Sequence, residues 1–109
     1  MNALVPAILA VAMISTTVAA EEVDIDQRNM HIFCASHLTL VNSLANGSDN
    51  GDQSLTLLAK LHREEGRKLG ATASHFSDVL RDLRNIHRND KAAWVRLSAQ
   101  SKRLCLPGD

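Results

Sequence analysis

Apolar residues recur at helical spacing in four stretches of the chain, and the alternation typical of strands does not occur. Spacings of three and four residues place such side chains on one face of a helix. The first stretch follows Asp24 and Asp26, either of which can cap a helix. Asn46-Gly47 is expected to end it, because both residues tolerate a left-handed backbone. Its apolar face consists of Met30, Phe33, Cys34, His37, Val41 and Leu44.

The second stretch begins near Asp52 or Ser54 and runs to Leu69. Gly66 lies inside it, where glycine costs up to about 1 kcal/mol relative to alanine. A close approach by a neighbouring backbone is one reason for a glycine at this position. The apolar face consists of Leu55, Leu58, His62 and Leu69, with Ala59 and Gly66 beside it.

Gly70 predicts a break before the third stretch, with Thr72 or Ser74 capping the next helix. One long bent helix is the alternative, because the apolar face continues past the glycine without a change of phase. The third stretch has the most regular face in the chain, and its other side is charged and predicted to lie in solvent. That face consists of Phe76, Val79, Leu80, Leu83, Ile86 and His87.

The fourth stretch is predicted to begin at Asn89-Asp90 and to end at Pro107-Gly108. Its face consists of Trp94, Leu97, Ser98, Ser101, Leu104 and Cys105. Four helices with short connections predict an all-α fold, a small antiparallel four-helix bundle in up-down-up-down order. In that order the first and fourth helices are neighbours, with the start of one beside the end of the other.

The first twenty residues have the pattern of a cleaved secretory signal. Residues 3–14 are almost entirely apolar and are followed by small residues and then by Glu21-Glu22. With cleavage after Ala20, residues 21–109 form a single helical domain, exported to a bacterial periplasm or secreted. No later apolar run approaches the ~20 residues of a membrane span. Asn46-Gly47-Ser48 is a glycosylation sequon, which matters in a eukaryotic source.

The chain contains two cysteines, Cys34 and Cys105. An exported chain with an even cysteine count is expected to form a disulfide, and both residues lie on apolar faces of helices predicted to be neighbours. Closing a loop of about 70 residues should stabilise the fold by roughly 4 kcal/mol. A free Cys34 would instead make His31-x-x-Cys34-x-x-His37 a possible copper or zinc cluster, an interpretation that the disulfide excludes.

Three histidines, His37, His62 and His87, fall on the apolar faces of the first three helices. They indicate one of two functions, either the binding of a metal or another ligand or a core that responds to pH. The second follows because buried histidines are neutral and become charged in acid. In the simpler interpretation each histidine packs in the core and makes one hydrogen bond. This interpretation is favoured because no carboxylate lies on the inner faces to complete a metal shell. We therefore predict no metal site and no cofactor.

Catalysis and nucleic-acid binding are not expected. The chain has no Gly-x-Ser-x-Gly motif and no glycine loop for a phosphate. Its net charge is zero and it contains one Trp, two Phe and no Tyr, so neither charge nor stacking favours nucleic acid. The charge is uneven, however: residues 21–52 carry six acids against Arg28, whereas residues 53–109 carry eleven bases against six acids.

Leu57 and Leu61 fall away from the apolar face of the second helix, among charged residues. An apolar pair rimmed by charge is typical of a contact with another protein or of self-association. The alternative is a wide buried face or an isolated surface leucine. The sequence thus indicates an exported protein-binding module (inhibitor, immunity or chaperone-like). In size, export signal and cysteine count it is similar to small periplasmic acid-stress chaperones and toxin-immunity factors, a likeness of architecture alone.

Overall fold

The structure is a computed structural model that describes residues 25–45 and 53–107. Within these ranges it contains four helices and no strand, which confirms the all-α fold class. The helices are residues 25–45, α2 (Gln53–Lys68), α3 (Ala73–Asn89) and α4 (Lys91–Leu104). Several predictions concern segments outside the described residues, namely the signal of residues 1–20, a cap at Asp24, the helix end at Asn46-Gly47 and the sequon.

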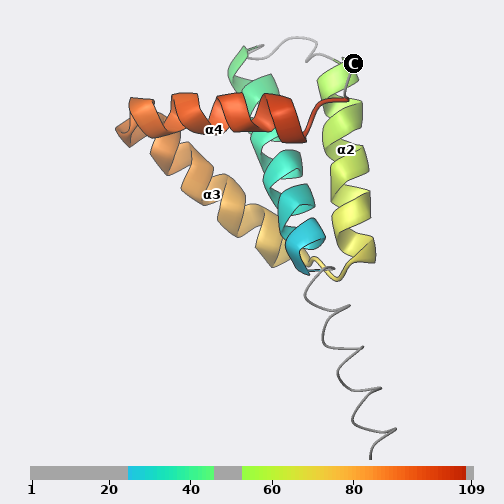
Figure 1. The fold of residues 1–109 in the computed structure, drawn as a ribbon. Coiled ribbons are helices and arrows are strands. Elements are labelled where there is room, and N and C mark those ends of the chain that lie inside the picture. The colour runs from blue at the N-terminus through green and yellow to red at the C-terminus, as the bar shows by residue number, and fades with distance from the viewer. Residues whose placement is uncertain (1–24, 46–52, 108–109) are drawn as a thin grey trace, which may run out of the picture.

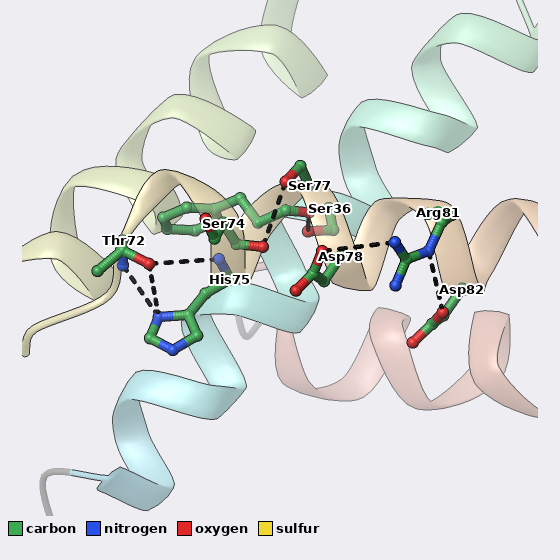
Figure 2. Close-up of polar contacts among 9 residues, drawn as sticks. Ser36, Thr72, Ser74, His75, Ser77, Asp78, Arg81 and Asp82 are labelled. Carbon is green, nitrogen blue, oxygen red and sulfur yellow. Dashed lines mark hydrogen bonds and ion pairs between the residues drawn. The ribbon is translucent and has the colours of Figure 1, made fainter.

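A tight turn separates α2 from α3, so the alternative of one bent helix is wrong. Gly70 has φ +99°, a left-handed conformation that costs other residues about 1–2 kcal/mol. Thr72 caps α3 as expected, and Figure 2 shows that His75 completes the cap. The His75 N–H donates to Thr72 Oγ1 at 3.4 Å, while His75 Nδ1 accepts from the Thr72 N–H at 3.0 Å.

The predicted faces of α3 agree with the observed burial. Leu83, at the centre of the apolar face, is 4% exposed. On the opposite side Arg81 pairs with Asp78 at 3.6 Å and with Asp82 at 3.7 Å, both in solvent (Figure 2). Asp90 is the single residue between α3 and α4, and its Oδ1 accepts from the Ala93 N–H at 3.0 Å to cap α4.

The first three helices run in alternating directions, and α4 runs across them (Figure 1). The contacts of α4 account for this crossing. Trp94, Ser98 and Cys105 span about 16 Å of α4 at 1.5 Å per residue, yet all three contact the single turn from Cys34 to His37. A helix lying lengthwise along the first one could not make these three contacts. The end of α4 therefore meets the middle of the first helix.

The first helix is buried almost all around its middle, rather than along one face as predicted. It lies between α2 and α3, and α4 crosses it (Figure 1). Ile32 and Leu40, which lie outside the predicted face, are each 4% exposed, whereas Leu44, within that face, is 47% exposed. Leu104 was likewise predicted to be on the inner face of α4 and is 47% exposed. The contacts of α4 with the first helix are made by Trp94, Ser98 and Cys105.

Polar and steric contacts fix the first helix against its neighbours. Asn42 Nδ2 donates to Thr56 Oγ1 of α2 at 2.8 Å, and Ser36 Oγ donates to the Phe76 carbonyl of α3 at 3.3 Å. A Cβ on Gly66 would lie 3.3 Å from Phe76 Cζ and 3.4 Å from the Cβ of His31. The close approach at this glycine is therefore made by side-chain atoms from two helices. None of the described helices is long and apolar enough to cross a membrane.

Candidate functional site

The predicted disulfide joins Cys34 to Cys105, with 5.3 Å between their Cα atoms. Cys34 is completely buried in the middle of the first helix, and Cys105 follows α4 and is 2% exposed. The bond consumes the only thiol of the His31-x-x-Cys34-x-x-His37 motif. Cys34 is therefore not available as a thiolate ligand, and the copper or zinc cluster does not form.

His31 and His62 form a hydrogen-bonded pair beside the disulfide. Their Nδ1 atoms lie 2.9 Å apart, and His62 Nε2 lies 2.8 Å from the carbonyl oxygen of Cys105. A carbonyl can only accept, so His62 Nε2 must carry the hydrogen. In a neutral ring its Nδ1 is then the acceptor, and His31 Nδ1 is the donor. The first helix, α2 and the end of α4 are thus linked by two hydrogen bonds in series.

The hydrogen bond between His31 and His62 requires that one of the two facing Nδ1 atoms carry no hydrogen. With both rings doubly protonated, two N–H groups would face each other across 2.9 Å and the hydrogen bond would be lost. Burial lowers the pKa of His31, the nearby His62 lowers it further, and Glu65 acts in the opposite direction. The sequence placed His62 on an inner face and His31 at an edge, and their contact depends on how the two helices are rotated.

His37 lies on a different side of the first helix. It is 3% exposed, its ring stacks on Trp94 with 4.9 Å between centroids, and its Nε2 lies 3.4 Å from Ser98 Oγ. Its Nδ1 has no hydrogen-bond partner among the described residues. His87 meets the same indole in a T-shaped arrangement, with 4.9 Å between ring centroids. The three predicted histidines therefore do not converge: His37 and His87 share Trp94, and His62 pairs with His31.

Burial lowers the pKa of His37, which makes the stability of the protein sensitive to acid. Below about pH 6.5 the unfolded chain binds a proton at this residue more readily than the folded chain does. The contribution of His37 is therefore complete above that pH and is lost as the pH falls toward the lowered value. We expect the urea midpoint to fall from pH 7.5 to pH 5, and to fall less in His37→Phe, which keeps an aromatic ring beside Trp94.

The same measurement on Leu83→Ala provides the control, since Leu83 is buried in α3 and has no titratable group. This variant should lose stability at both pH values and keep the wild-type difference between them. Equal pH dependence in the wild-type protein and in His37→Phe would show that His37 does not contribute to the acid sensitivity.

A mostly apolar hollow of about 410 Å³, here called the indole hollow, opens beside Trp94. The first helix, α2, α3 and α4 all contribute to its wall. Lys102 is the one residue with a permanent charge among the described residues that line it. The lining consists of His37, Leu38, Val41, Leu44, Ala45, Leu55, His87, Trp94, Ser98, Ser101, Lys102 and Leu106.

Leu57 and Leu61 are both at the surface, 58% and 49% exposed, so a wide buried face on α2 is excluded. They line a second hollow of about 300 Å³, together with residues that follow α4. We call these residues the leucine surface: Leu57, Leu58, Leu61, Leu106 and Pro107. Sequence reasoning did not include Leu106 or Pro107, because these residues come beside α2 through tertiary contacts, namely the disulfide and the hydrogen bond between His62 and the Cys105 carbonyl.

The leucine surface adjoins the indole hollow, because Leu55 and Leu106 line both hollows. Among the described residues, no group of three or more His, Cys, Asp or Glu side chains is placed to hold a metal ion. Comparisons of the chain with protein-family models, with curated proteins and with solved structures gave no match.

Proposed function

We propose that this chain is an exported protein-binding module that contacts its partner through the leucine surface. The observation that carries the proposal is the exposure of Leu57 and Leu61, one turn apart, beside a hollow of about 300 Å³. Contiguous exposed apolar side chains on a small soluble protein commonly mark an interaction site. Leu106 and Pro107 extend the apolar area beyond α2, so the contact would involve two parts of the chain.

The charges around the leucine surface indicate the chemistry of the partner. Lys60 lies between Leu57 and Leu61 in the sequence of α2, and Lys102 and Arg103 lie in the last turn of α4. Glu64 is one turn beyond Lys60. Three of these four charged residues are basic and one is acidic. A partner segment with apolar side chains and flanking Asp or Glu residues, such as an amphipathic helix, complements this surface.

Export is supported by two independent features. The first twenty residues have the pattern of a secretory signal, and the disulfide belongs to a periplasmic or extracellular environment, because cytosolic thiols are kept reduced. The partner would then be a periplasmic or secreted protein.

Leu57→Lys should leave the melting temperature nearly unchanged and should strongly weaken binding to the partner. The side chain is already in solvent, so a charge there costs little stability, but it would disrupt an apolar contact. A photo-crosslinking amino acid at position 57, in cells of the source organism, should capture the partner. Purified partner can then be titrated against the wild-type protein and Leu57→Lys.

Val95 provides the matched control, because it is 65% exposed and lies on α4 outside both hollows. Val95→Lys should bind like the wild-type protein, and a crosslinker at position 95 should give no adduct. If position 57 crosslinks only to a second copy of the chain, the leucine surface is a self-association seam, which sedimentation would detect. Equal binding by Leu57→Lys and Val95→Lys would contradict the proposal.

A further inference from the structure

The indole hollow has the size and lining of a small-molecule site. Its volume of about 410 Å³ falls within the range of roughly 300–1,000 Å³ that such sites occupy. Most of its lining side chains are apolar, with leucine and valine supplied by the first helix. A single acyl chain suits these walls, because it would bury apolar surface without requiring hydrogen bonds along its length.

The polar groups of the hollow favour an anion. Lys102 is the charged residue among those described in the lining, and His37 and His87 are the titratable ones. Ser98 and Ser101 provide hydroxyl groups, and the described lining contains no carboxylate. Lysine, hydroxyls and imidazoles can all donate hydrogen bonds to a carboxylate. A cationic ligand would meet no opposite charge there.

His37 contributes an aromatic ring to the wall of the hollow. The residue is 3% exposed, its Nε2 lies 3.4 Å from Ser98 Oγ, and its Nδ1 is closed to solvent. A ligand in the hollow would therefore meet this ring as part of the apolar wall and would not reach Nδ1.

From these features we propose that the indole hollow binds a single-chain fatty carboxylate, with its acyl chain against the apolar wall and its carboxylate near Lys102. The site shares Leu106 with the leucine surface, whereas Trp94 and Lys102 belong to the indole hollow and not to that surface. This inference does not rest on the proposed protein partner.

The chain contains one tryptophan, and Trp94 lies in the wall of the hollow, so its fluorescence reports on binding there. The probe is dodecanoate, added below its micelle concentration to the protein expressed from the full sequence. We expect a saturable change in Trp94 emission. Dodecanol, which lacks the charge, should bind several-fold more weakly, and dodecyltrimethylammonium should bind more weakly still.

Lys102→Gln should weaken dodecanoate binding by about fivefold, the effect of losing one partly exposed ion pair, and should leave dodecanol binding unchanged. Arg103→Gln is the matched control: it removes the same charge one residue away, at an exposed side chain outside the hollow, and should change neither affinity. Leu57→Lys should also bind dodecanoate normally, whatever it does to the protein partner.

Three results would overturn the inference. The first is the absence of a saturable change in Trp94 emission with dodecanoate. The second is equal loss of affinity in Lys102→Gln and Arg103→Gln, which would indicate attraction by general positive charge. The third is loss of dodecanoate binding in Leu57→Lys, which would place the fatty acid on the leucine surface instead of in the indole hollow.

Discussion

Replacing both cysteines with alanine, Cys34→Ala with Cys105→Ala, is expected to lower the free energy of unfolding by about 4 kcal/mol. The bond joins residues 71 positions apart. In the unfolded state it therefore restricts the conformations of most of the chain. Small domains have only about 5–15 kcal/mol of stability in total. The loss would therefore be a large fraction of what holds this protein together, and partial unfolding at 37 °C is expected.

Urea unfolding of the oxidised protein, the reduced protein and the double variant tests this expectation. The reduced protein and the variant should have similar midpoints, both far below that of the oxidised protein. The effect should also extend to the histidine pair, since the bond holds the Cys105 carbonyl 2.8 Å from His62 Nε2. Coincident midpoints for the oxidised protein and the variant would contradict a stabilising role for the disulfide.

Leu83→Ala is expected to cost about 2–5 kcal/mol, as other truncations of buried leucines do. Leu83 is 4% exposed and is the one fully buried apolar side chain along the described length of α3. Removing its three outer carbons leaves a cavity that the neighbouring helices can close only in part. The urea midpoint at pH 7.5 should fall accordingly.

Arg84→Ala is the matched control for Leu83→Ala, because Arg84 is the next residue of the same helix and is exposed. Alanine is a good helix former, so this change should alter stability by less than about 0.5 kcal/mol. Equal losses in the two variants would mean that α3 is rotated about its axis relative to the structure described above.

Local features of the sequence were sufficient to predict the helices of the described regions and the starts of α3 and α4. Gly70 separates α2 from α3, because it adopts a left-handed backbone that few other residues tolerate. Thr72 and Asp90 cap the helices that follow them through contacts only three residues away. Such interactions act within one or two turns, so a sequence displays them directly. The apolar face of α3 was predicted correctly for the same reason.

The disulfide could also be predicted, but its consequence for the architecture could not. An expected export signal and an even cysteine count predict a bond between Cys34 and Cys105 in any arrangement that brings them together. The crossing of α4 depends in addition on Trp94 and Ser98, which contact His37 one turn from Cys34. Periodicity shows that a helix has an apolar face. It does not show at what angle a neighbouring helix crosses that face.

By itself, then, the sequence determined the four helices, the caps of α3 and α4 and the cysteine pair, because each depends on neighbouring residues or on composition. Only the tertiary structure decided that the first helix is surrounded, that His31 pairs with His62, and that His37 and His87 share Trp94. The tertiary structure also decided that Leu106 lines both the indole hollow and the hollow of the leucine surface. The reason is physical: these contacts depend on the rotation and crossing of whole helices, which the packing of all the side chains sets together.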